Sequence, residues 1–242
     1  MELLVFDTYD EMSSAAANRL ATLASDYPSP LICPASGNTP LGLYRELIRM
    51  DAEKKIQTSS WIYVGLDEWI GMNEQDPGSC RYMLNEALFF PLATDKNRIH
   101  FFDGRSTDLA GQCRLMDNLI AGQGGIDISI LGLGMNGHIG FNEPGVSSDL
   151  RSHVIELDST TQQVGQKYFA QRQLLEKGIS IGLKTLREAG TNMLLVSGAS
   201  KAPVLKEVLE GEKTSLVPAS LLRDDSNLLI YADRDAASLL GK

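Results

Sequence analysis

The stretch Ile126–Gly145 reads IDISILGLGMNGHIGFNEPG and decides the predicted fold of this chain. Its first six residues, Ile126–Leu131, form an apolar run with the length of a buried strand. Four glycines follow this run at once: Gly132, Gly134, Gly137 and Gly140. Glycine allows tight turns and lets a ligand approach the backbone closely. Because ligands of open α/β sheets bind beyond the carboxyl ends of the strands, this stretch predicts a strand that ends in a ligand site.

Short apolar runs alternate with amphipathic segments along the whole chain. We expect strands at Leu3–Phe6, Leu31–Pro34, Ile62–Leu66, Ile99–Phe102, Ile126–Leu131, Val154–Leu157, Ile179–Ile181, Met193–Val196 and Leu228–Tyr231. We expect helices at Asp10–Ser25, Pro40–Lys54, Ser79–Phe89, Asp108–Ala121, Thr160–Glu176, Lys184–Glu188 and Lys201–Glu210. This alternation predicts an α/β fold with a mainly parallel sheet and helices on both faces. No linker, repeat or low-complexity tract interrupts it, so residues 1–242 are expected to form a single domain.

Composition narrows the classes of function. The chain has 242 residues and a net charge of −9, which argues against nucleic acid as a partner because phosphate backbones require clustered Lys and Arg. Three cysteines lie far apart without a CxxC pair, as expected of reduced thiols in a cytoplasmic protein. Three histidines without metal-ligand spacing predict no metal site. No run approaches the ~20 apolar residues of a membrane span, and the acidic N-terminus does not resemble a signal peptide.

The glycine-rich loop also contains Asn136, His138 and Glu143. An imidazole beside a carboxylate and an amide can hold, move and stabilise a proton. Glycine-rich loops often only turn the chain, and a single histidine is usually structural, so a purely structural loop is the alternative. The density of polar groups between the glycines favours a catalytic loop.

A second loop, CPASGNTP (residues 33–40), follows one predicted strand and opens a helix, with Thr39 expected as N-cap and Pro40 as the first helical residue. Ser36, Asn38 and Thr39 add short side-chain donors to the backbone N–H groups there. This arrangement is typical of a phosphate cradle, although it lacks both the Walker and the GxGxxG patterns. An ordinary capped turn is the alternative.

Charged residues at two other strand ends are further candidates. Asp67 and Glu68 follow the apolar run of residues 62–66, where a carboxylate could act as a general base. Either carboxylate could instead cap a turn. Lys201 stands at the start of a predicted helix, where a cation opposes the helix dipole unless an anion binds there. Lys167, within a predicted helix, is a weaker candidate, since most helix lysines are solvated.

Four motifs together resemble the glucosamine-6-phosphate deaminase family: ASGNTPLG (35–42), VGLDEWIG (64–71), GLGMNGHIGFNEPG (132–145) and SGASKAPVL (197–205). The resemblance extends from about residue 31 to residue 222. It implies a modified Rossmann-like fold and the conversion of glucosamine 6-phosphate and water to fructose 6-phosphate and ammonia. It also implies that no metal or organic cofactor takes part.

The same resemblance implies roles for individual residues. Asp67 matches the base that moves a proton from C2 to C1 of the open-chain sugar. His138 matches the acid–base group for ring opening, supported by Glu143 and Asn136. The phosphate contacts match a set of loop and basic residues: Ser36, Gly37, Asn38, Thr39, Lys167 and Lys201. Some relatives carry Asp where this chain has Asn136, which would leave Glu143 alone to offset an imidazolium charge.

Three alternatives remain at this point. A 6-phosphogluconolactonase shares the fold, but typically has Ala-Ser-Leu-Phe-Pro after the histidine and Asp-Glu-Arg at the earlier strand end. A galactosamine-6-phosphate deaminase differs only in the epimer that it accepts. A non-catalytic sugar-phosphate sensor could have lost Asp67 or His138, and this chain retains both.

The resemblance also bears on regulation. Allosteric, hexameric members of the family bind N-acetylglucosamine 6-phosphate through basic residues of the strand after the Asn-Glu-Pro loop. This chain has His153, Ile155 and Glu156 where those relatives place Arg, Lys and Thr. Because Ile155 offers no donor and Glu156 repels phosphate, we expect a monomer or small homo-oligomer without this effector site.

Overall fold

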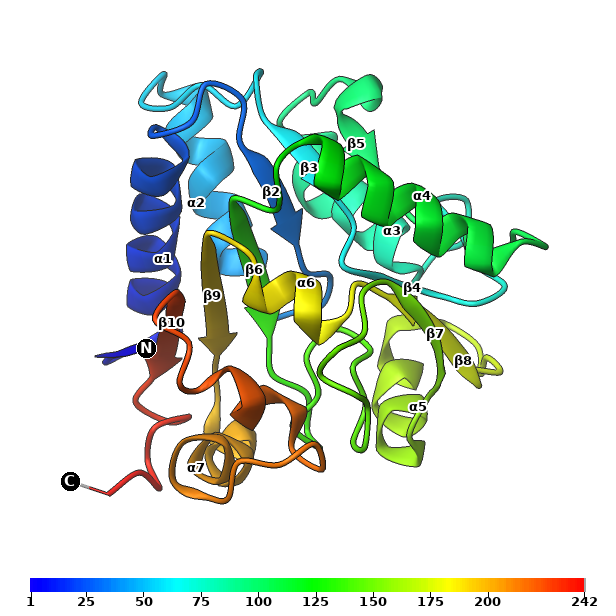
Figure 1. Cartoon of the computed structure of the whole chain (residues 1–242). Helices are drawn as coiled ribbons and strands as arrows, with labels where there is room; N and C mark the ends of the chain where they lie inside the picture. The colour runs from blue at the N-terminus through cyan, green and yellow to red at the C-terminus, as the bar shows by residue number, and fades with distance from the viewer. Residues whose placement is uncertain (242) are drawn as a thin grey trace.

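The computed structural model describes residues 1–241, and its centre is a seven-stranded sheet (Figure 1). The strands in spatial order are β1 (Glu2–Phe6), β10 (Leu228–Asp233), β9 (Thr191–Val196), β6 (Ile128–Gly132), β2 (Leu31–Pro34), β3 (Ile62–Val64) and β5 (Ile99–His100). Every neighbouring pair in this sheet is parallel. The predicted α/β fold with a mainly parallel sheet is therefore confirmed.

The order of the strands creates a switch point between β2 and β6. From β2 the chain proceeds outward to β3 and β5, and then returns to place β6 on the other side of β2. The two central strands pair through Ile32 with Ile128 and Pro34 with Ile130. In Figure 1 the arrowheads of β2, β6 and β9 all point toward the region where α5 and α7 lie. A crevice for a ligand forms at such a switch point, beyond the carboxyl ends of the strands.

Helices cover both faces of the sheet, as predicted (Figure 1). One face packs against α1 (Tyr9–Ala24) and α2 (Leu41–Ala52), and the other against α4 (Leu109–Gly122), α6 (Leu183–Arg187) and α7 (Ala202–Glu210). Successive strand residues supply the two cores, because side chains alternate across a strand. In β2, Leu31 and Cys33 enter the core on the α4 side, while Ile32 enters the α1–α2 core.

A second, three-stranded antiparallel sheet lies beside the first. It has the order β4 (Asp67–Trp69), β8 (Lys177–Ser180) and β7 (His153–Glu156). The sequence pattern did not predict β4. It did predict strands close to β7 and β8, but as members of the strand–helix alternation and not of a separate antiparallel sheet. A small core around Trp69, Phe141 and Leu175 holds this sheet together. The second sheet therefore adds a wall to the crevice rather than extending the main sheet.

The remaining segments are short. They comprise α3 (Cys80–Leu84) with the π-helical turn Asn85–Phe89, α5 (Ser159–Gly165), and 3-10 turns at Lys96–Arg98, Gln166–Tyr168, Ala199–Lys201 and Pro218–Leu222. The predicted helix Thr160–Glu176 is therefore wrong in length. The Gln166 side chain bonds both backbone groups of Gln173, at 2.9 Å to its carbonyl oxygen and 3.0 Å from its amide. These two hydrogen bonds turn the chain back after α5, and the helix ends there.

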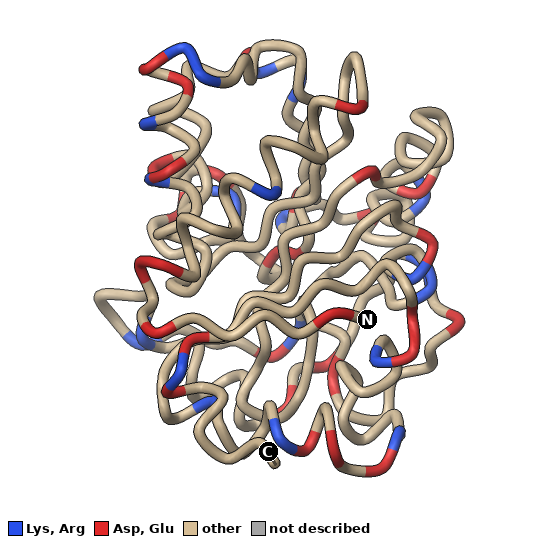
Figure 2. The backbone as a smooth tube through the Cα atoms, turned by 90° about the vertical axis from the view of Figure 1, so that its left-hand side faces the viewer, with Lys and Arg blue, Asp and Glu red and all other residues tan. Residues whose placement is uncertain are grey.

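Charges of both signs are interspersed along the outer segments seen in Figure 2. Several of them form exposed pairs within one helix, such as Arg49 with Glu46 and Glu53, both at 2.8 Å. Within residues 1–241, no helix combines the length and the apolar content needed to cross a membrane.

Candidate active site

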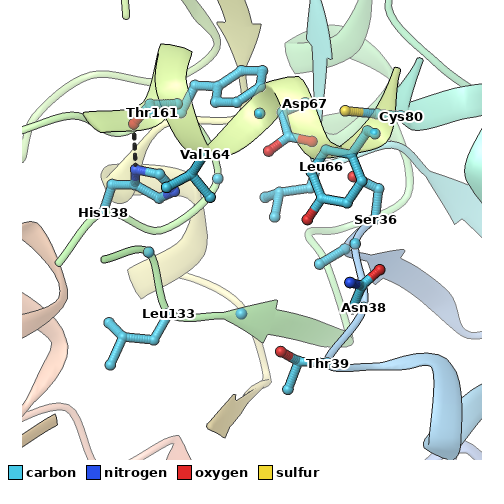
Figure 3. A pocket seen from close by; sticks show the side chains of 18 of the residues that line it. Ser36, Asn38, Thr39, Leu66, Asp67, Cys80, Leu133, His138, Thr161 and Val164 are labelled. Atoms are coloured by element: carbon cyan, nitrogen blue, oxygen red, sulfur yellow. Dashed lines mark hydrogen bonds between the residues drawn. The ribbon is translucent and has the colours of Figure 1, made fainter. Parts of the chain in front are cut away.

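A cavity with an empty volume of ≈ 950 Å³, partly open to solvent, lies at the carboxyl ends of β2 and β6. The predicted site residues that line it are Ser36, Gly37, Asn38, Thr39, Asp67, His138, Lys167 and Lys201. Asn136 and Glu143 lie behind His138 and contact it or its partners. Loops from β2, β6 and β9, together with β4 and α5, thus bring together residues that are far apart in the sequence (Figure 3).

The loop after β2 has the form of an anion cradle. Gly37 has a φ of 96°, which favours glycine, and a Cβ there would lie 3.0 Å from the Tyr168 hydroxyl oxygen. Among residues 1–241, no acceptor is paired with the amides of Gly37, Asn38 and Thr39, so these amides are available to a ligand. The predicted N-cap at Thr39 is wrong, because α2 begins at Leu41 with Pro40 as its N-cap. The Thr39 side chain makes no cap and lines the cavity instead.

Two lysines bring positive charge to the cavity. Lys201, the N-cap residue of α7, donates from Nζ to the Leu133 carbonyl oxygen at 2.6 Å. Burial, and secondarily the charge of Lys167, lower the pKa of Lys201 to about 8. Lys167 Nζ lies 4.9 Å from the centroid of the Tyr168 ring. An anion bound between the two lysines would relieve their mutual repulsion and hold both in the charged form.

Asp67 is the buried carboxylate of the cavity. It is the first residue of β4 and only 7% exposed, and burial raises its pKa to about 6. A hydrogen bond from the Cys80 thiol and the proximity of His138 oppose this rise. Figure 3 shows the Cys80 sulfur beside the Asp67 carboxylate, facing the cavity. A carboxylate with a pKa raised toward neutrality is a stronger base than an ordinary aspartate.

Glu68, the other predicted carboxylate, points away from the cavity. It is fully buried and accepts hydrogen bonds from the amides of Trp69, Cys80 and Arg81 at 2.9, 2.9 and 3.0 Å. Burial raises the pKa of Glu68 to about 7, against the effect of these amides. Glu68 therefore anchors the start of α3, which also positions Cys80 beside Asp67. The two neighbouring acids divide into one that faces the cavity and one that holds the structure.

His138 is held on one side by two oxygen atoms. Its Nδ1 lies 3.0 Å from Thr161 Oγ1 in α5, as Figure 3 shows, and 3.4 Å from Glu143 Oε2. Engagement of Nδ1 leaves Nε2 free to exchange a proton with a ligand. The ring also depends on Gly134, because a Cβ there would lie 2.3 Å from His138 Cδ2.

Glu143 is nearly fully buried, at 3% exposed, and stays ionised. Burial opposes its charge, but hydrogen bonds with His138, Thr161 and Asn136 outweigh this effect and lower its pKa below the ordinary value. Asn136 contributes Nδ2, which donates to Glu143 Oε2 at 2.9 Å, and Oδ1, which accepts from the His138 amide at 3.3 Å. Asn136 thus contacts the carboxylate and the backbone of the loop rather than the imidazole ring.

Several residues of the site were not predicted. Thr161, Cys80 and Tyr168 line the cavity, and Asp158 lies behind it, 3.4 Å from Asn136. The LDSTT segment that contains Asp158 and Thr161 carries a helix-capping signal that marks the start of α5. Across residues 1–241, no three His, Cys, Asp or Glu side chains are arranged to hold a metal ion.

Comparisons with known proteins agree with this geometry. The family model described as "Glucosamine-6-phosphate isomerases/6-phosphogluconolactonase" matches residues 7–231. Among curated proteins, glucosamine-6-phosphate deaminase 1 of Bacillus subtilis (strain 168) is 35% identical over 240 residues, covering 99% of each chain. The glucosamine-6-phosphate deaminase of Clostridium perfringens (strain 13 / Type A) is 36% identical over 241 residues, covering 99% of this chain and all of that protein.

Solved structures give the same result. A monomeric glucosamine-6-phosphate deaminase superposes with a TM-score of 0.95 at 35% identity, covering 99% of this chain and 100% of the other. A 6-phosphogluconolactonase from Thermotoga maritima superposes with a TM-score of 0.76 at 18% identity, covering 96% and 99%, and so shares the fold. The chain belongs to the glucosamine-6-phosphate isomerase/6-phosphogluconolactonase family. The curated relatives from Bacillus subtilis and Clostridium perfringens are both named glucosamine-6-phosphate deaminases.

Proposed function

We propose that this chain converts glucosamine 6-phosphate and water to fructose 6-phosphate and ammonia. The sugar ring opens to an amino aldehyde, and a proton then moves from C2 to C1. Together with the transfer of a proton from the amine nitrogen to O1, this turns the C1 aldehyde into an alcohol-bearing carbon and the C2 amine into an imine. Water adds to the imine, and ammonia leaves as the ketone forms. Neither oxidation nor reduction from outside is needed.

One observation carries the proposal: a single cavity contains a buried carboxylate, a carboxylate-supported imidazole and an anion cradle with two lysines. The proton transfer between carbons requires a base, for which Asp67 is suited by its raised pKa. Ring opening requires proton exchange between two oxygens, for which His138 is suited because Nδ1 is held and Nε2 is free. The sequence relatives named as deaminases support the same activity.

The substrate phosphate would bind at the switch point. The amides and side chains of the Ser36–Thr39 loop would donate to its oxygens, and Lys201 and Lys167 would offset its charge. With the phosphate fixed there, the other end of the sugar extends toward Asp67 and His138. We further propose that the protein is cytoplasmic, since its proposed substrate belongs to a class of intracellular metabolites.

The test is to supply glucosamine 6-phosphate, galactosamine 6-phosphate and 6-phosphogluconolactone separately. Ammonia release and lactone loss are measured in parallel. The proposal expects ammonia from glucosamine 6-phosphate with a kcat/KM well above that for the galactose epimer. Lactone loss without ammonia release would assign the chain to the lactonases, and binding of the sugars without turnover would indicate a sensor.

The pH dependence should report the Asp67 carboxylate. Because only the ionised form accepts a proton, and its pKa is raised to about 6, activity should fall tenfold per pH unit below that value. The substrate phosphate titrates near the same pH, at about 6. A variant that changes only the pKa of Asp67 is therefore needed to tell which of the two groups causes the loss of activity. The Cys80→Ala variant removes a hydrogen bond that lowers the pKa of Asp67. We therefore expect its acidic limb to lie about one unit higher, as the loss of one charge-assisted hydrogen bond would produce.

The Cys80→Ser variant is the matched control for this shift, since its hydroxyl can still donate to Asp67. Its acidic limb should remain near that of the wild type. Identical profiles for Cys80→Ala and the wild type would show that the limb belongs to the substrate and not to Asp67.

Removing the Lys201 ammonium should weaken substrate binding more than it slows the reaction. A hydrogen bond to a charged group contributes about 1.5–3 kcal/mol, so Lys201→Ala should raise KM by about 10- to 100-fold. The kcat should change far less, because the phosphate contact is the same in the ground state and the transition state. Steady-state kinetics measure both values, with Lys206→Ala on the exposed, Glu210-paired face of α7 as the control. An unchanged KM would show that Lys201 does not contact the substrate phosphate.

We expect hyperbolic kinetics, no activation by N-acetylglucosamine 6-phosphate, and a monomer or small homo-oligomer. In β7, the His153 ring is buried and its Nδ1 lies 3.0 Å from the Arg151 carbonyl oxygen, while Glu156 is exposed beside Lys177. This strand offers a phosphate no cluster of donors, and one solved relative is monomeric. Light scattering and initial rates with and without the effector test this. A hexamer, or a sigmoidal rate curve that the effector makes hyperbolic, would contradict it.

A further inference from the structure

The Asn136 side chain lies between two carboxylates. Its Nδ2 donates to Glu143 Oε2 at 2.9 Å and faces Asp158 Oδ1 at 3.4 Å, while its Oδ1 accepts from the His138 amide at 3.3 Å. A primary amide nitrogen carries two hydrogens, so one hydrogen can serve each carboxylate. The neutral amide therefore joins two negative groups that would otherwise repel each other.

Asp158 belongs to a different element from the other members of this chain of contacts. It is the N-cap residue of α5, where its Oδ1 accepts from the Thr160 amide at 2.8 Å. Thr161, three residues after Asp158, places its hydroxyl oxygen 3.0 Å from His138 Nδ1. Asp158 thus lies at the start of the helix whose Thr161 contacts His138 Nδ1, and it also reaches this nitrogen through Asn136 and Glu143.

The charge state of Asp158 fits this position. Hydrogen bonds from Thr160, and to a lesser extent from Asn136, lower the pKa of Asp158 below its ordinary value. It therefore carries a negative charge at neutral pH. Glu143 is ionised as well, so the amide of Asn136 connects two carboxylates, of which only Glu143 contacts the ring.

We propose that Asp158 is a positioning residue for His138 and acts through Asn136 and Glu143, a set that we name the Asp158 relay. Asp158 fixes the direction of the Asn136 amide, so that its hydrogens point to the carboxylates and its oxygen points to the His138 backbone. The amide then holds Glu143 Oε2 against His138 Nδ1. The relay supplies a second negative charge that stabilises the imidazolium formed when His138 accepts a proton. Its contribution to turnover rests on the proposed function.

In this chain the relay depends on the amide of Asn136. An aspartate at position 136 would keep the shape of the side chain but lose both hydrogens. Its carboxylate would face Glu143 and Asp158 at the distances where the amide nitrogen now lies. Three carboxylates would then share one small region, and their repulsion would displace Glu143 from the ring.

The first test uses Asp158→Asn, which keeps an N-cap side chain and removes only the charge. Residues in one hydrogen-bond network couple by about 0.5–3 kcal/mol, so kcat on the cyclic sugar should fall about tenfold. The unfolding temperature should remain within about 2 °C of the wild type, since Asn and Asp are equivalent caps. An unchanged kcat in Asp158→Asn would reduce Asp158 to a helix cap and overturn the proposal.

The second test is a double-variant cycle. Asn136→Asp should lose more activity than Asp158→Asn, because it brings the third carboxylate into the cluster. The double variant Asn136→Asp with Asp158→Asn returns the cluster to two carboxylates, and should recover about tenfold of the activity lost in Asn136→Asp. If Asp158 were only the N-cap of α5, the double variant would show no such recovery of activity. If the two substitutions simply add, the relay is wrong.

A third measurement does not depend on turnover. The titratable groups that face the His138 ring are Glu143 in its own loop, Asp67 from β4 and, through Asn136, Asp158 from α5. In Asp158→Asn, the NMR chemical shifts of the His138 ring protons at one fixed pH should therefore move from their wild-type values, because Glu143 is no longer held in the same place against the ring. His138→Gln assigns the signals among the three histidines. Unchanged ring-proton shifts would overturn the relay. If the wild type releases no ammonia from any hexosamine phosphate, the proposed function fails, while this comparison of chemical shifts still decides the relay.

Discussion

Replacing Asp67 with asparagine is expected to lower kcat by about 10²–10⁴-fold, the usual contribution of a general base. The amide keeps the size of the carboxylate but cannot accept the C2 proton. The proposed phosphate contacts come from the Ser36–Thr39 loop and the two lysines and not from Asp67, so KM should change by less than about threefold. Ammonia release under steady-state conditions measures both constants.

Exchange of the C2 hydrogen with solvent deuterium isolates the step itself. The wild type should exchange this hydrogen, and Asp67→Asn should not do so on the timescale of wild-type turnover. Asp108→Asn is the matched control, since Asp108 is an exposed N-cap of α4 and asparagine also caps a helix. Near-normal ammonia release by Asp67→Asn would assign the base to another residue.

The main sheet could be predicted because its central strands β2, β6, β9 and β10 are buried on both faces. Parallel strands of this kind read as continuous apolar runs, which are easily distinguished from the amphipathic helices between them. The run Leu31–Pro34 was predicted with the bounds of β2, and Met193–Val196 falls within β9. The boundaries of α1 were also predicted to within a residue, because its apolar residues recur with a helical period and Thr8 provides a cap.

The second sheet could not be predicted in this way. β4 has three residues, Asp67–Trp69, of which two are charged, and neither its length nor its composition marks a strand. It exists because Glu68 is stabilised by two amides of a segment that lies 12 or 13 residues further along the chain. The end of α5 could not be predicted either, because it depends on the two hydrogen bonds between the Gln166 side chain and the Gln173 backbone. Contacts between distant segments override local propensity at both places.

The site was predictable where the chemistry is local. Asn136, His138 and Glu143 lie within eight residues, and the glycines around them mark a loop that approaches a ligand. The partners from other segments were not predictable. Thr161 reaches His138 and Cys80 reaches Asp67 only because α5 and α3 fold over the cavity. The contact between Asn136 and Asp158 could not be predicted for the same reason, since Asp158 belongs to the start of α5.

His138→Gln should lower kcat on cyclic glucosamine 6-phosphate by about 10²-fold, since it removes one acid–base group. The loss should be less than about tenfold on an acyclic analogue that lacks the hydroxyl groups able to close a ring. Such an analogue needs no proton exchange between O1 and the ring oxygen, and therefore bypasses the proposed task of His138. Asp67→Asn, by contrast, should be equally impaired on both substrates, because the C2 proton must move in either case.

The ratio of the two losses separates the roles of the two residues more sharply than either loss alone. A variant that is merely misfolded loses activity on both substrates, so its ratio stays near one. His100→Gln, on β5 and outside the cavity, provides the matched control and should show neither loss. If His138→Gln were as impaired on the acyclic analogue as on the cyclic sugar, the imidazole would take part in the C2 proton transfer itself. Asp67 and His138 would then act on one step, and ring opening would require another group among the residues that line the cavity.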